Sequence, residues 1–133
     1  MDDCIFCKIG AGVIPAHKIH EDENYLAFLD RNPNSDGHTL VIPKKHYRFV
    51  WDIEEGGKYF EFCQKVAKHF QEVTKDELVF SVIHGEAVPH AHIHLIPNNH
   101  GTYGEKLSEF AKSVSGSPLT DEKVSEIVNL LKF

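Results

Sequence analysis

The chain is short of positive charge, has no long apolar run and carries an odd number of cysteines. It has 14 Lys and Arg against 20 Asp and Glu, a formal net charge of −6, so we expect no nucleic-acid partner. No segment approaches the roughly 18 consecutive apolar residues of a membrane-spanning helix. Residues 1–4 lack the basic and apolar regions of a secretory signal, so we expect a cytoplasmic protein with no membrane partner.

The three cysteines do not fit the even-numbered disulfide framework of a small secreted protein. Two of them form the motif Cys4-Ile5-Phe6-Cys7, and in a reducing compartment such a pair more often binds a metal or does redox chemistry. The third, Cys63, falls in an amphipathic helical pattern and is predicted to lie in the core.

The length and composition are those of one globular domain. With 133 residues, 41% of them hydrophobic and 26% charged, the chain is long enough to bury about two-thirds of its unfolded surface. We therefore predict a single domain spanning residues 1–133, with no internal repeat.

Hydrophobic patterns of period two, bounded by turn residues, predict five strands. They lie at residues 18–21, 25–30, 38–43, 78–83 and 88–97. The predicted fold is α+β, with about five antiparallel strands, one long helix and C-terminal helices, the helices lying on one side of the sheet.

The long helix is predicted over residues 53–75, where the hydrophobic period changes to 3.6. Its expected buried stripe is Tyr59, Phe60, Cys63, Val66, Ala67, Phe70 and Val73. A short helical turn is expected at residues 4–13, and two further helices at residues 103–114 and after Thr120, which can act as the N-cap.

Three histidines alternate with apolar residues near the end of the predicted sheet, in Val88-Pro89-His90-Ala91-His92-Ile93-His94-Leu95. In an extended strand every second side chain leaves from the same face, so the three imidazoles are expected to project together. Such a row can bind a metal or supply a nucleophile and proton donors. One alternative is a catalytic zinc held by all three histidines, although the thiolates of the Cys-x-x-Cys pair compete for zinc.

Four separate blocks of the chain occur in the order of one known family. They are Cys4-Ile5-Phe6-Cys7-Lys8-Ile9, Tyr25-Leu26-Ala27-Phe28-Leu29-Asp30, Gly37-His38-Thr39-Leu40-Val41-Ile42-Pro43-Lys44-Lys45-His46 and His90-Ala91-His92-Ile93-His94-Leu95-Ile96. Together they closely resemble the histidine-triad (HIT) family, over the chain from Cys4 to about Pro97.

The resemblance implies a nucleotide hydrolase or nucleotidyl transferase that attacks the α-phosphate of a purine nucleotide derivative, such as a phosphoramidate or a dinucleoside polyphosphate. It implies that His92 is the nucleophile and forms a transient nucleotidyl-imidazole. His94 and His38 would hold phosphate oxygens and manage protons. Either a backbone carbonyl or His38 would fix the tautomer of His92.

The resemblance also implies a binding site and a metal site. Asp30 would bind the ribose hydroxyls, and Leu29, Gly85, Glu86 and Val88 would lie beside the nucleotide. In the branch of the family that begins with Cys-x-x-Cys, the matching residues hold a structural zinc, which here implies Cys4, Cys7, His46 and His90. Whether His46 or His20 completes that set is left open. A homodimer is also implied.

The chain departs from the family where phosphoramidate hydrolases usually carry Gly-Gln-Ser ahead of the triad. Here the stretch is Gly85-Glu86-Ala87, which lacks the serine hydroxyl and adds a negative charge, and it follows a shortened turn. The leaving-group preference is therefore expected to differ. A second interpretation is a zinc-stabilised module that binds a nucleotide or a partner with little catalysis.

Overall fold

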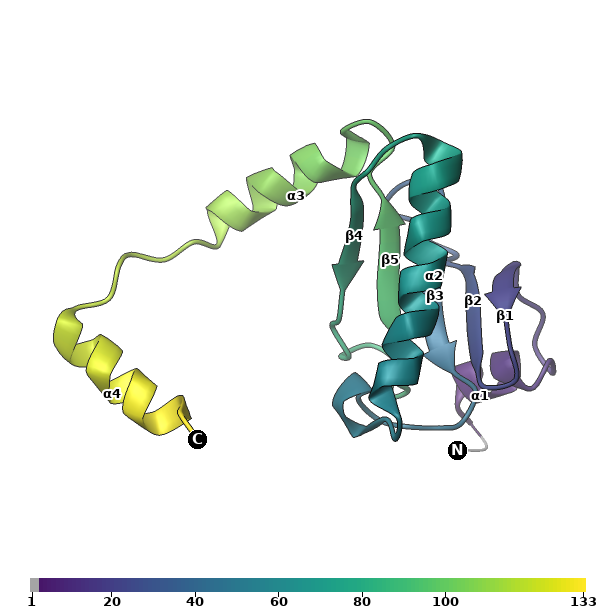
Figure 1. Cartoon of the computed structure of the whole chain (residues 1–133), viewed down its shortest axis with the longest axis horizontal. Coiled ribbons are helices and arrows are strands. Elements are labelled where there is room, and N and C mark those ends of the chain that lie inside the picture. The colour runs from purple at the N-terminus through teal and green to yellow at the C-terminus, as the bar shows by residue number, and fades with distance from the viewer. Residues whose placement is uncertain (1–2) are drawn as a thin grey trace.

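The computed structural model of the chain describes residues 3–133, and residues 1 and 2 of the N-terminal segment considered above lie outside that range. Five strands form one antiparallel sheet in the order β1-β2-β3-β5-β4 (Figure 1). They span Lys18–Glu21 (β1), Tyr25–Leu29 (β2), Thr39–Pro43 (β3), Val79–Val82 (β4) and Ile93–Pro97 (β5). The five-stranded antiparallel sheet predicted from the sequence is confirmed.

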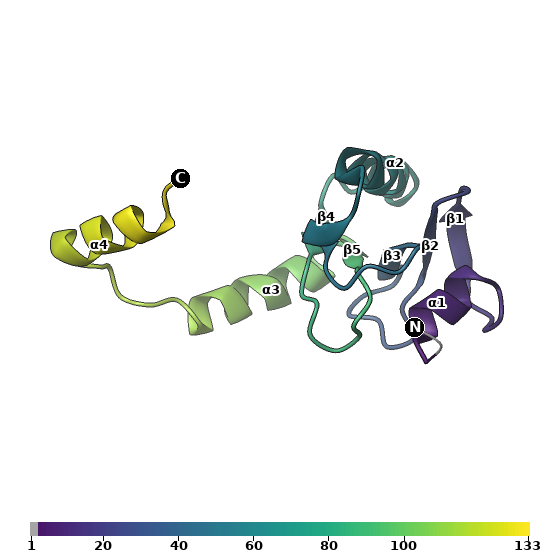
Figure 2. The same cartoon turned by 90° about the horizontal axis from the view of Figure 1, so that it is seen from below.

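The helices surround this sheet unevenly. They span Ile5–Gly10 (α1), Gly56–Thr74 (α2), Thr102–Ser113 (α3) and Asp121–Leu131 (α4), and a short 3₁₀ turn covers Val50–Asp52 (η1). Helix α2 lies along one face of the sheet, α1 packs on the opposite face, and α3 and α4 extend away from the sheet (Figures 1 and 2). The prediction that the helices share one side is therefore wrong.

Strands β2 and β3 are buried on both faces of the sheet because each face has its own apolar cluster. Ala27 and Val41 point to the α2 side, where they pack with Phe62 and Val66 of α2. Alternate residues of the same strands, including Leu26, pack against α1 on the other side. Alternate residues of these strands thus pack into two apolar cores, one on each face of the sheet, rather than into one core with the other face exposed to solvent.

Helix α2 buries a stripe that differs in part from the predicted one. Tyr59, Cys63, Val66 and Phe70 are buried as expected, together with Phe62. By contrast, Phe60 is 46% exposed and Val73 is 59% exposed. The hydroxyl of Tyr59 donates to the carbonyl of Val41 at 2.7 Å, which fixes the rotation of the helix against β3.

The C-terminal helices begin as the sequence predicts. Thr120 is the N-cap of α4, and its hydroxyl oxygen accepts a hydrogen bond from the backbone N–H of Lys123 at 3.2 Å.

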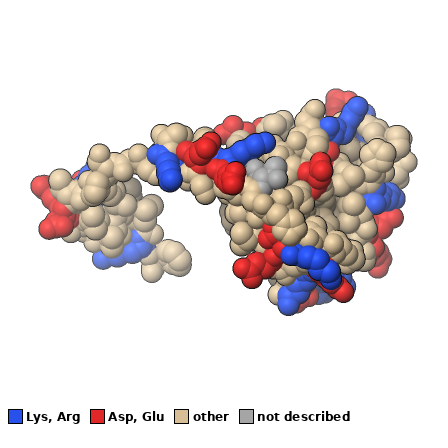
Figure 3. Space-filling model, turned by 90° about the horizontal axis from the view of Figure 1, so that it is seen from above, with Lys and Arg blue, Asp and Glu red and all other residues tan. Residues whose placement is uncertain are grey.

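Basic and acidic side chains are interspersed on the face shown in Figure 3. Among the described residues 3–133, none of the helices combines the length and the apolar character that a membrane crossing requires.

Neighbouring phenylalanines of α2 give a matched test of this packing. Replacing the buried Phe62 with Ala should lower the free energy of unfolding by about 3–5 kcal/mol, because it opens a cavity against the sheet. Phe60→Ala, a change of the same size at an exposed position, should cost less than about 1 kcal/mol. Urea unfolding of both variants measures the difference, and equal losses would contradict the observed helix face.

Candidate active site and metal centre

The three histidines lie on one face of the chain, but only His94 belongs to a strand. Strand β5 begins at Ile93, so the prediction that the strand starts at Val88 is wrong, and His90 and His92 precede the strand in irregular chain. The alternation still holds. Ala91, Ile93 and Leu95 pack in the apolar cluster on the α2 side.

The imidazoles face α1. The ring of Phe6, in α1, meets His90 and His92 edge to face, with ring centroids 5.8 and 5.3 Å apart. The centroids of His92 and His94 lie 5.1 Å apart. The sequence therefore brings the three rings to a common face, as the spacing predicts.

His92 is buried, and a backbone carbonyl determines which of its nitrogens carries the proton. Its Nδ1 lies 2.8 Å from the carbonyl oxygen of His90. A carbonyl can only accept, so Nδ1–H donates, and in the neutral ring Nε2 keeps a free lone pair. Of the two ways to fix this tautomer that the resemblance implies, the geometry selects the backbone carbonyl.

A hydrogen-bond chain of fixed direction runs through His38 and His94. The backbone N–H of Asn34 donates to Nδ1 of His38 at 3.0 Å, so a neutral His38 carries its proton on Nε2. That Nε2 donates to Nδ1 of His94 at 2.8 Å and lies 3.6 Å from Oδ2 of Asp30. A neutral His94 therefore presents an Nε2–H.

The loop that supplies the Asn34 N–H is anchored at both ends. The hydroxyl of Ser35 donates to the carbonyl of Pro97 at 2.7 Å, at the end of β5. The N–H of Asp30 donates to the carbonyl of His38 at 2.8 Å. The sequence analysis did not single out Asn34, and it could not, because the contact is made by backbone that any residue carries.

Burial keeps this histidine pair neutral. Desolvation lowers the pKa of His38, against an opposing effect of Asp30. Desolvation, reinforced by His92 and His38, lowers the pKa of His94 to about 4. Both rings are thus uncharged near neutral pH, as the hydrogen-bond directions above require.

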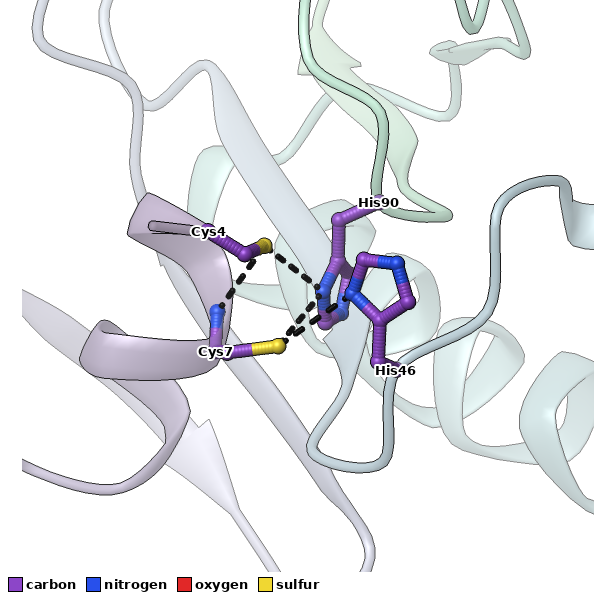
Figure 4. Close-up of side chains that lie close together, drawn as sticks. All are labelled: Cys4, Cys7, His46 and His90. Carbon is purple, nitrogen blue, oxygen red and sulfur yellow. Dashed lines mark hydrogen bonds between the residues drawn. The ribbon is translucent and has the colours of Figure 1, made fainter. Parts of the chain in front are cut away.

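The ring of His90 points toward the N-terminal cysteines (Figure 4). Its Nδ1 lies 3.3 Å from Sγ of Cys4 and 3.5 Å from Sγ of Cys7. Nδ1 of His46 lies 3.2 Å from Sγ of Cys7. The ligand atoms of these four residues all lie within 4.8 Å of one another, so the group can hold a metal ion.

The donors of this cluster suit zinc. The sulfur–nitrogen distances of 3.2–3.5 Å are close to the about 3.6 Å expected between ligands of a tetrahedral Cys₂His₂ zinc site. Nε2–H of His90 donates to the carbonyl of Pro43 at 2.8 Å, which leaves the Nδ1 lone pair for a metal. Burial raises the pKa of the Cys7 thiol to about 11, and a bound cation is what would ionise it.

Two other metal arrangements do not fit the geometry. His20 stacks on Phe62 on the α2 side, with ring centroids 5.3 Å apart, so His46 is the histidine at the cysteines. One zinc held by all three triad histidines is contradicted, because His90 faces the cysteines while Nδ1 of His94 accepts from His38.

A second group, Asp30, His38 and His94, also places its ligand atoms within 4.8 Å of one another. The proton that the Asn34 N–H forces onto Nε2 of His38 occupies the position that a metal would need. This group is therefore better described as a hydrogen-bond network than as a metal site.

The residues expected beside a nucleotide lie at two positions. Leu29 and Asp30, at the end of β2, are half-buried. Gly85, Glu86 and Val88 lie in the segment between β4 and β5, where Glu86 is exposed and Val88 packs against the α1-side cluster. Gly85 has a φ of +78°, which favours glycine.

Sequence reasoning missed the residue that holds this segment. Nη1 of Arg48 donates to the carbonyl of Gly85 at 2.8 Å. Arg48 lies two residues beyond His46, and an isolated arginine outside any motif gives no signal from which this contact could be predicted.

Comparisons with known proteins identify the family. The profile of the HIT domain matches residues 11–101. An uncharacterised HIT-like protein of Methanocaldococcus jannaschii is 40% identical over 133 aligned positions, covering 85% of this chain and 99% of that protein. An adenosine 5′-monophosphoramidase of Schizosaccharomyces pombe is 37% identical over 109 positions, covering 76% of this chain and 78% of that protein.

A solved structure of the same family has a similar fold. The crystal structure of a member of the HIT family from Bacillus subtilis superposes with a TM-score of 0.69 at 31% identity. The match covers 87% of this chain and 99% of that one.

The neutral His94 predicts a pH dependence of stability. Its folded-state pKa of about 4 lies below the ordinary value of 6.5, so between these values the unfolded chain binds a proton that the folded chain does not. This contribution is complete above about pH 6.5 and is lost as the pH falls toward 4. Urea unfolding at several pH values should show the wild type losing more stability over this window than His94→Asn. Parallel profiles would contradict a neutral, desolvated His94.

Proposed function

The chain belongs to the HIT family, and we propose on that basis that it is a nucleotide hydrolase or nucleotidyl transferase acting at an α-phosphate. The observation that carries the proposal is the state of His92. Its Nδ1–H is held by the carbonyl of His90 at 2.8 Å, and the free Nε2 lone pair shares a face with the neutral His38–His94 pair. A neutral imidazole of this kind is a good nucleophile near pH 7.

The first step forms a covalent intermediate. Nε2 of His92 attacks the α-phosphorus, a phosphorus–nitrogen bond forms, and the bond from phosphorus to the leaving group breaks. The leaving group departs with the bonding electron pair and takes up a proton from solvent, while the Nε2–H of the neutral His94 would donate a hydrogen bond to a phosphate oxygen. Two displacements in succession replace one difficult displacement.

The second step releases the nucleotide. Water, or another acceptor, attacks the same phosphorus, the phosphorus–nitrogen bond breaks, and the electron pair returns to Nε2 of His92. The acceptor's proton is released to solvent, and His94 keeps its Nε2–H in both steps. His38 keeps His94 in the correct orientation throughout, because its own Nε2–H donates to Nδ1 of His94 at 2.8 Å.

The nucleotide is bound from the end of β2. The Asp30 carboxylate would accept hydrogen bonds from the ribose hydroxyls, with Leu29 beside it. Gly85, Glu86 and Val88 would line the opposite side of the nucleotide. The half-buried position of Asp30, 3.6 Å from His38, supports this role because it puts the carboxylate next to the phosphate-binding histidines.

The substrate class is a purine nucleotide with a leaving group on its α-phosphate, as in phosphoramidates or dinucleoside polyphosphates. The relation to a protein named as an adenosine 5′-monophosphoramidase supports it. Glu86 adds a negative charge near the substrate, and Ala87 lacks a hydroxyl there, so relative rates on different leaving groups are expected to differ from those of family members with Gly-Gln-Ser.

A structural zinc belongs to the same proposal. Cys4, Cys7, His46 and His90 would hold it as a closed site, and when bound it supplies a cross-link rather than chemistry on the substrate. The residues it joins are the start of α1, the segment after β3 and the segment that carries the triad. No catalytic step uses it.

Three expectations remain predictions. A homodimer is supported by the unpaired outer edge of β4 and by the exposed side chains of Phe60 and Val73 on α2. A single domain over residues 1–133 and a cytoplasmic location are likewise inferred from the sequence alone.

A zinc-stabilised binding module is the second candidate, and the stretch Gly85-Glu86-Ala87 favours it because a hydroxyl is missing and a charge is added beside an anionic ligand. It predicts nucleotide binding without a covalent intermediate. The two candidates therefore differ in one observable, a nucleotidylated protein.

Substituting the nucleophile distinguishes them. His92→Ala should lower kcat by at least about 10³-fold on an adenosine phosphoramidate, because the covalent route is lost while the fold stays intact. Rapid-quench mass spectrometry without acid should find an added nucleotidyl mass on the wild type and none on His92→Ala. A variant that keeps full turnover contradicts the mechanism. Binding by the wild type with neither turnover nor adduct would establish the binding module instead.

A further inference from the structure

Two aromatic side chains are exposed in the segment that follows His46. Phe49 is 45% exposed and Trp51 is 75% exposed, and we call this pair the aromatic ledge. The backbone beneath it is well fixed, because Val50 and Ile53 are buried and the Phe49 N–H donates to Oδ2 of Asp52 at 3.1 Å. The rings are therefore held out into solvent by an ordered 3₁₀ turn.

The segment that carries the ledge is hydrogen-bonded to the triad segment and to the segment that precedes the triad. The N–H of Ala91, which lies between His90 and His92, donates to the carbonyl of Tyr47 at 2.7 Å. Arg48 follows Tyr47 directly and donates to the carbonyl of Gly85 at 2.8 Å. A Cβ placed on Gly85 would lie 3.7 Å from the ring of Phe49.

Arg48 provides a positive charge at the base of the ledge. Its guanidinium stacks over the Phe49 ring, 4.2 Å from the centroid. Within residues 3–133, the only hydrogen-bond acceptor of this guanidinium is Gly85, and no carboxylate pairs with it. A guanidinium has five N–H donors, so several stay free for an anion.

The neighbouring cations differ in this respect. Lys44 pairs with Glu21 at 3.0 Å and Lys45 pairs with Glu54 at 3.4 Å. Glu86 is exposed on the segment that Arg48 holds. An unpaired cation beside two exposed aromatic rings is the chemistry that recognises a nucleotide, with phosphate on the cation and the base stacked on a ring.

We propose that Arg48, Phe49 and Trp51 form a subsite for the leaving group, and that this subsite takes a nucleoside phosphate. The inference rests on the proposed function and refines it, since it favours dinucleoside polyphosphates over substrates with a small leaving group. In the first step the bond from the α-phosphorus to the bridging oxygen breaks. The departing nucleoside phosphate leaves as an anion with the electron pair, and the subsite forms no covalent bond.

Two substrates with the same adenylyl half test the subsite. Diadenosine triphosphate has a base on its leaving group, whereas adenosine 5′-phosphoramidate releases only ammonia. Trp51→Ala should lower the ratio of kcat/KM for the first substrate to that for the second by about 10-fold, the size of one base stack. Trp51→Phe should keep the ratio within about threefold. Phe110→Ala, which removes a 62% exposed ring on α3, is the matched control and should not change it.

A binding measurement decides the question without turnover. Trp51 is the only tryptophan of the chain, so intrinsic fluorescence reports on the ledge directly. ADP should quench the wild type at lower concentrations than adenosine does, and Arg48→Met should remove that difference.

Three results would overturn the subsite. The first is an equal loss of kcat/KM on both substrates in Trp51→Ala, and the second is the absence of fluorescence quenching by ADP. The third is a change in the molecular mass of Trp51→Ala in solution, which would show that the ledge is a contact between two copies of the chain. If the wild type turns over neither substrate, the proposed function fails, while quenching by ADP still supports a nucleoside phosphate site.

Discussion

His90 makes three contacts on which the rest of the site depends. Its Nδ1 faces the sulfurs of Cys4 and Cys7 at 3.3 and 3.5 Å, its Nε2–H donates to the carbonyl of Pro43, and its own carbonyl accepts from Nδ1 of His92. The first two contacts fix the ring, and fixing the ring fixes the backbone. The third then determines which nitrogen of His92 keeps a free lone pair. The cysteines therefore influence the proposed nucleophile from outside the proposed nucleotide site.

Neutral histidines complete the arrangement, and they are neutral because they are buried. A charged imidazole would be costly at His94. Desolvation and the neighbouring histidines lower the pKa of this side chain to about 4. With both rings neutral, the N–H of Asn34 gives the whole His38–His94 chain one direction. Backbone groups thus place the protons of His38, His90 and His92, and the side chain of His38 places that of His94.

Much of the fold could be predicted from the sequence because hydrophobic period is a local property, and the site residues could be grouped because four motifs occur in a known order. Other features depend on distant pairing. The strand begins at Ile93 rather than Val88, because the N–H of Ala91 bonds to Tyr47 instead of continuing the ladder with β3. Phe62 replaces Phe60 in the core because the sheet, not the period, selects the helix face. Arg48 makes its contact with Gly85 through a loop that no local pattern predicts.

The central claim is that the cysteine cluster sets the tautomer of His92 through His90. The most direct test is ¹⁵N NMR of the imidazole nitrogens, in the zinc-loaded protein and after removal of zinc by a chelator. With zinc bound, His92 should show a protonated Nδ1 and an unprotonated Nε2, and after removal the signal should move toward the tautomer average of free histidine. If zinc does not bind, or if the His92 signals are identical with and without it, the account is contradicted.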